Sequence, residues 1–369
     1  WLKHMSMLRG ARAAACLARA SCPSAWTKPQ PPPRPMSSLE LDSVRAQLAL
    51  RPALQQKLVA HRGWHRDHGA AGSRPVENTR QAYVDAAALG VAYAECDVWV
   101  TKDGQLVLSH DFNFRALAED PSEELATRPI AELRWEELRR LRLVTGCAPV
   151  LLLTVLQDLA PTSTRLAIEL KSSSCALPLA ACLAGRPELW TAVGFVLAFS
   201  LNALEIVSST LEGAGSDTRL VWIVDNPRVP YDEGALDEGE TTFDYSAESL
   251  PAFLERTGLT ERVRRLRCGL YLQYNPAVTA QGLLELRGAL HGLSGACGLL
   301  GLWSDRSLDP DVDTAEALCS LLPALDLLNS DLPETFFADA GPPALDLLNS
   351  DLPGTFFVDV GAPRMVKAN

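Results

Sequence analysis

Short apolar runs alternate with longer amphipathic stretches over most of the chain. The runs have the length and composition of buried strands, and the stretches between them repeat apolar residues at helical spacing. Strands are predicted at 58–63, 92–100, 166–171, 194–200, 219–225, 269–274, 298–303 and 325–330. Helices are predicted between them at 79–89, 201–211, 247–257, 280–290 and 314–322.

This alternation predicts an α/β fold, a (β/α)8 TIM barrel, because consecutive parallel strands need a crossover helix. A chain of 369 residues, 47% of them hydrophobic, can bury one large core. Such a barrel typically occupies about 250 residues. We therefore expect an extension over residues 1–50, a barrel domain over 51–335 and a tail over 336–369. A small helical insertion is predicted after the second strand, at about 112–160, beside the active site.

Two of the predicted strands carry carboxylates on one face. Side chains alternate along a strand, so Glu95 and Asp97 point to one side and Cys96 to the other. Like charges held that close raise each other's pKa, and a divalent cation relieves the repulsion. Glu169 and Lys171 share a face of the next well-defined strand and need charged partners if buried. The pattern predicts a cation site, with solvated charges or a cross-strand salt bridge as the structural alternatives.

His61 and His110 each follow an apolar run and stand beside charged residues. Histidine can donate and accept a proton near neutral pH, so the pair suits an acid and a base. The candidate residues lie toward the C-terminal ends of the strands, where parallel barrels place their active sites. The sequence thus predicts metal-assisted acid–base chemistry on a phosphate, with Arg62 and Lys171 stabilising its charge.

The order of these motifs resembles the glycerophosphodiester phosphodiesterase family. Six signals occur in the family's order: His61-Arg62-Gly63, Glu77-Asn78-Thr79, Glu95-Cys96-Asp97, Thr101-Lys102-Asp103-Gly104, His110-Asp111 and Glu169-Leu170-Lys171. Later segments resemble the family more weakly, at 199–202, at Trp303 and at 329–333. One departure is a displaced proline, Pro75, before the Glu-Asn-Thr motif. The resemblance covers roughly residues 58–333.

The resemblance implies hydrolysis of a glycerophosphodiester to glycerol 3-phosphate and an alcohol. It also implies that glycerol's own 2-hydroxyl attacks first, giving a cyclic phosphate that water opens. The predicted site has three ligands for one Mg or Ca ion, three phosphate- or substrate-binding residues and two catalytic histidines: Glu95, Asp97 and Glu169; Arg62, Lys171 and Trp303; His61 and His110. An ordinary core position is the alternative for Trp303.

Two other functions stay open. The first is a lipid phosphodiesterase on the same barrel, resembling lysophospholipase D or sphingomyelinase D. A basic or apolar rim at the barrel mouth would favour it, and the sequence shows no clear one. The second is a catalytically inactive barrel, against which the intact histidines and carboxylates argue.

Composition and charge limit the kinds of partner that the protein is expected to bind. A net charge of −11 makes nucleic acid an unexpected partner, since binding to it depends on a basic surface. No apolar run approaches the length of a transmembrane segment. The nine cysteines occur singly, without the short paired spacings of a zinc site or disulfide scaffold, so we expect reduced thiols and an intracellular protein. Nothing in the sequence determines the oligomeric state.

The two ends of the chain differ from its centre. Residues 1–39 contain no acidic side chain, carry scattered basic ones and end in a proline-rich stretch, which resembles a mitochondrial or plastid transit segment. Without such targeting we expect a cytoplasmic protein. Residues 323–341 recur at 343–361 with only three differences. A closed barrel has no edge for a ninth parallel strand, so we expect the first copy to supply strand eight.

Overall fold

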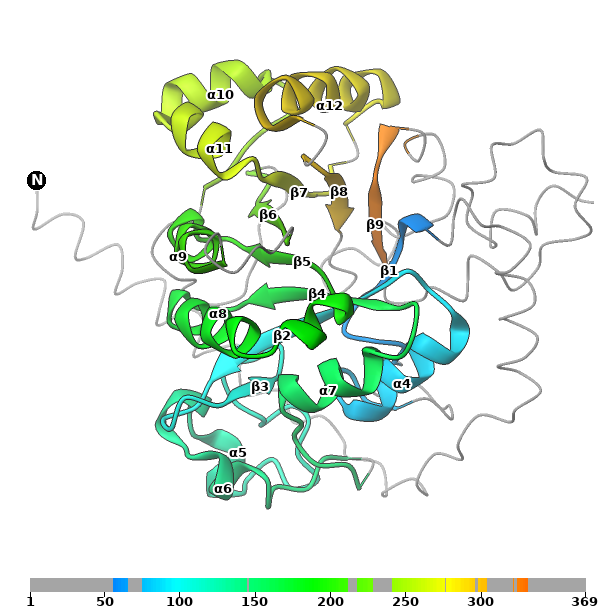
Figure 1. Cartoon of the computed structure of the whole chain (residues 1–369), viewed down its shortest axis with the longest axis vertical. Helices are drawn as coiled ribbons and strands as arrows, with labels where there is room; N and C mark the ends of the chain where they lie inside the picture. Colours follow the sequence, from blue (N-terminus) through cyan, green and yellow to red (C-terminus); the bar gives the residue numbers. More distant parts are fainter. Residues whose placement is uncertain are drawn as a thin grey trace, which may run out of the picture. The chain divides into compact units, whose positions relative to one another are not determined.

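The structure is a computed structural model that describes residues 56–65, 75–144, 146–211, 218–227, 241–275, 277–295, 298–303, 321 and 324–330. One sheet of nine strands organises these residues (Figure 1). The strands are β1 (Leu58–Ala60), β2 (Tyr93–Val100), β3 (Leu106–Leu108), β4 (Arg165–Leu170), β5 (Val193–Ala198), β6 (Arg219–Val224), β7 (Gly269–Gln273), β8 (Leu300–Trp303) and β9 (Leu327–Ser330).

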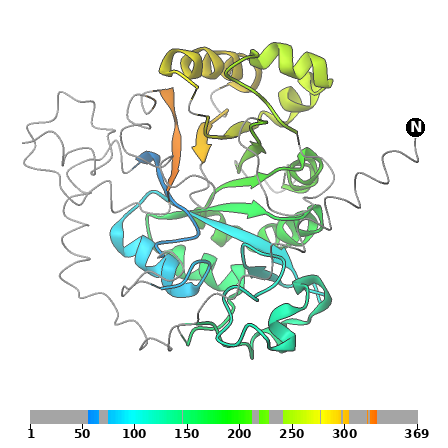
Figure 2. The same cartoon turned by 180° about the vertical axis from the view of Figure 1, so that it is seen from behind.

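The sheet closes on itself through its parallel strands. Its order is β1-β9-β8-β7-β6-β5-β4-β2-β3, and β1 also pairs with β2. Eight parallel strands therefore each have two neighbours, while β3 pairs antiparallel with β2 outside this ring. Figure 2 shows β9, in orange, beside β1, in blue, where the ring closes. This arrangement confirms the α/β class and agrees with the predicted barrel.

Helices connect the parallel strands and cover the outside of the sheet (Figure 1). The α-helices are α4 (Arg80–Leu89), α5 (Glu124–Thr127), α6 (Trp135–Leu138), α7 (Leu152–Leu159), α8 (Ala176–Ala184), α9 (Leu201–Leu211), α10 (Leu250–Thr257), α11 (Thr260–Leu266) and α12 (Ala280–Ser294). Short 3₁₀-helices lie at η1 (Ile130–Glu132), η2 (Ser173–Cys175) and η3 (Pro187–Ala192). No described helix is long and apolar enough to span a membrane.

Strand alternation divides the core into an outer and an inner layer. On β7, Leu270 and Leu272 belong to the large cluster that packs the strands against the helices. Tyr271, between them, belongs to a smaller cluster inside the barrel. We call the buried members of this second group the inner apolar cluster: Val59, Ala167, Phe195, Leu197, Val221, Ile223, Tyr271 and Leu327.

Two glycines make room for large rings inside the barrel. A Cβ at Gly301 would lie 2.2 Å from ring atoms of Tyr271, and one at Gly194 would lie 2.7 Å from the ring of Tyr93. A side chain at either position would displace an aromatic ring. The neighbouring strands therefore alternate large and small residues to fill the interior.

The predicted strands correspond to the eight parallel strands of the ring, with ends that differ by a few residues. The apolar run before His110 forms β3, so this histidine follows a hairpin rather than a barrel strand. Two helices outside the bounds of the predicted insertion, α8 and α11, were not predicted. The segment after β3 contains the short α5, η1 and α6 over a separate buried cluster that includes Phe114 and Leu138. Its identification as the helical insertion remains a prediction.

The first copy of the tail repeat supplies β9, which pairs with both β8 and β1, as predicted. The second copy, the extension at 1–50 and the helix predicted at 314–322 lie outside the described residues, apart from residue 321. Five cysteines in the described part of the chain have free thiols: Cys96, Cys147, Cys175, Cys182 and Cys268.

Candidate active site

Three carboxylates from two adjacent strands converge at the C-terminal end of the barrel interior. Parallel pairing of β2 with β4 places Asp97 opposite Glu169, and alternation turns Glu95 to the same face. One oxygen from each residue lies within 4.8 Å of the others. Glu95 and Asp97 are each only 1% exposed. We call these three residues the carboxylate cluster; the structure brings all three predicted ligands together.

Burial and mutual repulsion perturb Glu95 most clearly. Burial raises the pKa of its carboxyl well above the usual value, and the charges of Asp97 and Glu169 raise it further. The backbone N–H of Arg62 donates to Glu95 Oε2 at 2.9 Å and partly offsets this rise in the pKa. Glu95 Oε1 is buried without a hydrogen-bond partner among the described residues. A hard cation is the kind of ligand that such an oxygen lacks.

The charges around the cluster do not balance. Four acidic side chains surround two basic ones: Glu77, Glu95, Asp97 and Glu169 around Arg62 and Lys171. Negative charge therefore exceeds positive charge around the cluster, which favours a bound cation. Carboxylate oxygens are the preferred ligands of Mg²⁺ and Ca²⁺, so the residues present fit a hard divalent ion.

Arg62 reaches the cluster from a strained turn after β1. Its φ of 53° and the 52° of Asn78 lie in the left-handed region that non-glycine residues rarely adopt. The Asn78 N–H donates to the Arg62 carbonyl at 3.0 Å, so the two turns support each other. The Arg62 guanidinium donates to both oxygens of Glu77 at 3.2 Å, and its Nε lies 3.6 Å from Asp97 Oδ2. Strain of this kind persists where surrounding contacts over-determine the backbone.

Gly63 lets this turn pack on α4. Its φ is +82°, and a Cβ there would lie 2.8 Å from the Ala82 Cβ. Both facts require glycine at this position. The His61-Arg62-Gly63 motif therefore combines two chemical groups with the one residue that fits the turn.

Asn78 anchors the second carboxylate of β2. Its Nδ2 donates to Asp97 Oδ2 at 2.8 Å, and its Oδ1 accepts from the Asp97 N–H at 3.2 Å. Tyr83 of α4 donates its hydroxyl to the same Oδ1 at 2.7 Å. The predicted site did not include Asn78 or Glu77, although their motif was recognised. The motif itself was the signal that could have identified both.

Lys171 directly follows β4 and contacts two members of the carboxylate cluster. Its Nζ is 2.9 Å from Glu169 Oε1 and 3.4 Å from Asp97 Oδ1, with only 5% of its side chain exposed. Two carboxylates thus hold the ammonium group, and the pair with Asp97 is the cross-strand salt bridge that the sequence left open as the structural alternative. The buried ammonium adds positive charge beside the carboxylates.

The two histidines contact different acidic partners. His61 Nε2 lies 3.9 Å from Glu95 Oε2. His110 Nδ1 lies 3.1 Å from Asp111 Oδ1, and the Trp99 indole donates to the His110 carbonyl at 3.2 Å. Burial raises the pKa of Asp111, with a further rise from Glu77, while Arg62 and Lys171 lower it. Asp111 thus interacts electrostatically with the groups that surround the carboxylate cluster.

Trp303 lies at the C-terminal end of β8, partly buried against the inner apolar cluster. Its ring meets Phe199 edge to face, with centroids 6.3 Å apart. The two aromatic rings form a wall near the mouth of the barrel. The role of Trp303 in substrate binding remains a prediction.

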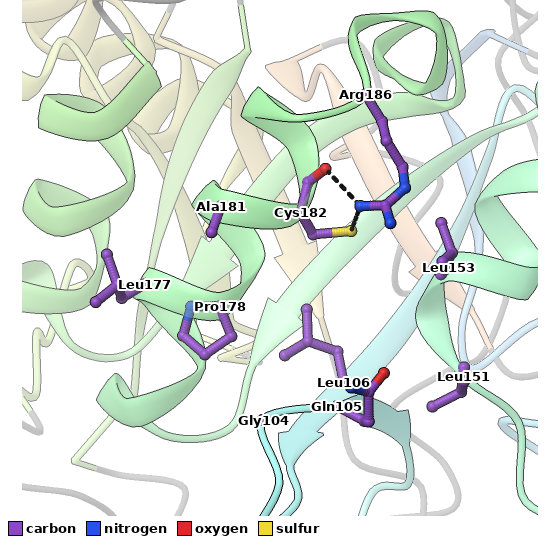
Figure 3. Close-up of a pocket in the computed structure, with 10 residues that line it drawn as sticks. All are labelled: Gly104, Gln105, Leu106, Leu151, Leu153, Leu177, Pro178, Ala181, Cys182 and Arg186. Carbon is purple, nitrogen blue, oxygen red and sulfur yellow. Dashed lines mark hydrogen bonds between the residues drawn. The ribbon is translucent and has the colours of Figure 1, made fainter.

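A separate pocket of about 470 Å³ lies outside the barrel (Figure 3). Leu106 of β3, Leu151 and Leu153 at the start of α7, and Pro178 of α8 are among its mostly aliphatic lining. At one end Arg186 donates to the Cys182 carbonyl at 3.4 Å. None of the predicted site residues lines this pocket.

The fold and the site together define an α/β barrel with a candidate divalent-cation centre and two candidate acid–base histidines. Residues 61–178 match the model of the glycerophosphoryl diester phosphodiesterase family, a stretch that contains every candidate residue except Trp303. Over these residues the chain is similar to that family.

Individual relatives are distant or partial. The chain is 34% identical over 85 residues to the glycerophosphocholine phosphodiesterase GDE1 of Eremothecium gossypii. These 85 residues are 22% of this chain and 6% of that protein. A glycerophosphodiester phosphodiesterase structure from Parabacteroides distasonis has a TM-score of 0.51 at 19% identity, covering 75% of this chain and 93% of that one. An Oleispira antarctica phosphodiesterase, solved with its product sn-glycerol-3-phosphate, has a TM-score of 0.50 at 17% identity over 75% and 94%. At these identities the structures support the fold.

Proposed function

We propose that the chain is a metal-dependent glycerophosphodiester phosphodiesterase that releases glycerol 3-phosphate and an alcohol. The observation that carries the proposal is the buried carboxylate cluster, with its excess negative charge, beside His61 and two cationic side chains. The family match over residues 61–178 agrees with this chemistry. A purely structural cluster would be expected to balance its charges internally.

Glu95, Asp97 and Glu169 would hold one divalent cation, Mg or Ca, through their carboxylate oxygens. Bound there, the cation would polarise the phosphoryl oxygens of the diester. Asn78 fixes the Asp97 carboxylate, and the Arg62 N–H fixes Glu95, so the ligands are oriented before binding. This support makes the cluster pre-organised rather than assembled by the ion.

Arg62 and Lys171 would bind the remaining charge of the phosphate. Arg62 already shares its guanidinium between Glu77 and Asp97, and Lys171 bridges Glu169 and Asp97. Charge-assisted hydrogen bonds from such groups stabilise a phosphate more strongly as its charge increases in the transition state. The two residues would therefore hold the substrate beside the cluster and contribute to catalysis.

His61 and His110 would divide the proton transfers. If Nδ1 of His110 donates to Asp111, the ring is held in one tautomer and Nε2 is left to accept or donate the moving proton. His61, beside Glu95, would carry the complementary role. One histidine removes a proton from the attacking hydroxyl, and the other protonates the leaving alcohol.

The test is a product assay on the purified protein. Glycerophosphocholine is the first substrate, because the Eremothecium gossypii relative is named for it. Release of glycerol 3-phosphate is measured with Mg²⁺, with Ca²⁺ and with a chelator, for the wild type and for His110→Ala. Release that requires a cation and is abolished by the substitution supports the proposal. A folded protein that binds the ion but releases nothing would point to a lipid substrate, and one that binds no ion would contradict the proposal.

A further inference from the structure

One buried polar side chain inside the barrel is not used by the proposed chemistry. Gln273 ends β7, and its neighbour two residues before, Tyr271, belongs to the inner apolar cluster. Alternation therefore turns the Gln273 side chain into the barrel as well. The residue is 1% exposed, although it lies at the end of its strand.

The orientation of the Gln273 amide is fixed. Its Oε1 accepts a hydrogen bond from the Asn226 backbone N–H at 3.0 Å. Because a backbone N–H can only donate, the other end of the amide must be the donor Nε2. That Nε2 is buried without an acceptor among the residues that the structure describes. A buried donor in this state destabilises the folded protein unless a water or a ligand supplies an oxygen.

Gln273 faces the space that the carboxylate cluster faces. In an eight-stranded barrel, alternate strands contribute side chains to one layer, and β2 and β7 are both even members of this ring. Followed from strand to strand, the register leads from Asp97 on β2 to Gly269 on β7. An eight-stranded barrel with a shear of about 8 shifts a layer by about one residue per strand, which places Gln273 in the layer of Asp97, on the far side of the barrel. It also pairs Gln273 with Trp303 of β8. The amide is thus part of the interior wall opposite the cluster.

The neighbouring residue on β6 narrows the chemistry of the ligand. Asp225 follows Val224 at the C-terminal end of β6 and is 7% exposed. It shares the inward face with Val221 and Ile223 of the inner apolar cluster. A phosphate oxygen would be repelled by this carboxylate. A hydroxyl group can accept from Gln273 and donate to an acidic neighbour, so it fits both.

We propose that Gln273 Nε2 donates a hydrogen bond to a hydroxyl of the bound diester, which makes the ends of β6 and β7 a hydroxyl-binding subsite. The inference rests on the proposed function and adds a specificity residue to it. The hydroxyl comes either from the glycerol moiety or from the leaving alcohol. In both cases the amide contributes to binding rather than to proton transfer.

The test uses two substitutions that separate donation from support of Asn226. Gln273→Glu keeps an oxygen for the Asn226 N–H and removes the Nε2 donor, whereas Gln273→Met removes both. The matched control is Gln281→Met, on the exposed start of α12, where the amide donates to Glu285. kcat and KM are measured with glycerophosphocholine, whose alcohol brings no further hydroxyl, and with glycerophosphoinositol, whose alcohol brings several. Dissociation constants of both diesters are measured by calorimetry on the His110→Ala background, which needs no turnover.

We expect both Gln273 variants to raise KM and the dissociation constant about three- to tenfold, the usual effect of one hydrogen bond, with kcat nearly unchanged. A loss with both diesters assigns the hydroxyl to glycerol, and a loss with glycerophosphoinositol alone assigns it to the leaving alcohol. Wild-type affinity in Gln273→Glu with a defect only in Gln273→Met would show a structural role and overturn the inference. An inactive wild type would contradict the proposed function, but calorimetry on the His110→Ala background would still test whether Gln273 binds the diester. If no variant binds either diester, both the proposed function and the role of Gln273 are overturned.

Discussion

The interior of the barrel has two halves built on different principles. From the N-terminal ends of the strands up to Leu197 and Ile223, the inner apolar cluster fills the space with rings and aliphatic groups, fitted against small residues such as Gly194 and Gly301. Toward the C-terminal ends, like charges are buried together in the carboxylate cluster, and Arg62 and Asn78 adopt left-handed backbone conformations. The first half lowers the free energy of the folded chain, and the second half raises it.

Tyr271 marks the boundary between the halves. Its ring packs in the inner apolar cluster, while burial raises the pKa of its phenol, and the charges of Glu95 and Glu169 raise it further. The hydroxyl has no hydrogen-bond partner among the described residues. Unsatisfied groups therefore begin at the level of Glu95 and continue to Gln273. This distribution indicates that ligands, rather than protein groups, supply the missing hydrogen-bond partners near the C-terminal ends of the strands.

The largest effect on activity should come from the histidines, because their removal should lower turnover and leave stability nearly unchanged. His110→Ala should lower kcat about a hundredfold to ten-thousandfold, because a general acid or base has that typical value, with little change in the melting temperature. Steady-state rates and thermal melts check both parts. His291→Ala, on the exposed side of α12, is the matched control and should retain full activity. Full turnover in His110→Ala would remove that residue from the proposed mechanism.

The opposite result is expected in the inner apolar cluster. Phe195→Ala removes a fully buried ring that packs on Tyr93 with centroids 5.2 Å apart. It should lower the free energy of unfolding by about 3–5 kcal/mol, measured by urea titration, because the truncation leaves a cavity. The molecules that remain folded should keep their kcat. Phe112→Ala, at a ring that is 53% exposed, provides the control and should change stability little. A loss of stability at Phe112 as large as at Phe195 would mean that burial is not the cause.

The carboxylate cluster should respond to a cation in a way that no apolar cluster can. At a concentration of one hundred times Kd, Mg²⁺ or Ca²⁺ should stabilise the wild type by about 2.7 kcal/mol. Glu95→Gln should lose most of this gain yet be more stable than the wild type in a chelator, because a neutral amide relieves the repulsion from Asp97 and Glu169. Thermal melts with and without the ion measure both differences. The control is Glu119→Gln, at an exposed position, which should behave as the wild type. If Glu95→Gln is less stable than the wild type in chelator, the electrostatic argument is contradicted.

Much of the fold was predictable because its strands are short apolar runs between polar turns. The helices differed in how clearly their apolar periodicity could be recognised in the sequence. In α8 the buried residues Ala176, Leu179, Ala180 and Leu183 have helical spacing, but Leu177 is apolar too and 61% exposed, which hides the pattern. The short α11 buries only Val263 and Leu266, too few positions to define a period.

The carboxylate cluster was predictable for a different reason. Alternation on a strand is a local rule, and before any contact was known it placed Glu95 with Asp97 on one face of one strand and Glu169 with Lys171 on one face of the next. The supporting contacts are not local. The hydrogen bond from Asn78 to Asp97 depends on turns in which Arg62 and Asn78 have positive φ. Neither position is a glycine, so the sequence carries no signal for these turns. Gln273 had a weaker signal, a single amide in an otherwise apolar strand.

The smallest effect should come from charges that are balanced, which contrasts with the carboxylate cluster. Glu205 of α9 accepts hydrogen bonds from Arg262 and Arg265 on α11, and these bonds, chiefly that of Arg262, hold its pKa below the ordinary 4.5. The folded form therefore binds this proton less tightly than the unfolded form. The stabilisation is complete above pH 4.5 and is lost as the pH falls through the lowered pKa.

Because these side chains are partly exposed, Glu205→Gln should cost only about 0.5–1 kcal/mol at pH 7, with activity unchanged. The cost should disappear in acid and shrink in high salt, which urea titrations at several pH values can measure. Glu261→Gln removes a pair within α11 alone, with Arg264, and should cost only about 0.2–0.5 kcal/mol. Equal costs for the two variants would mean that linking the helices adds nothing. A rise in stability for Glu205→Gln would mean that the balanced pair resembles the carboxylate cluster after all.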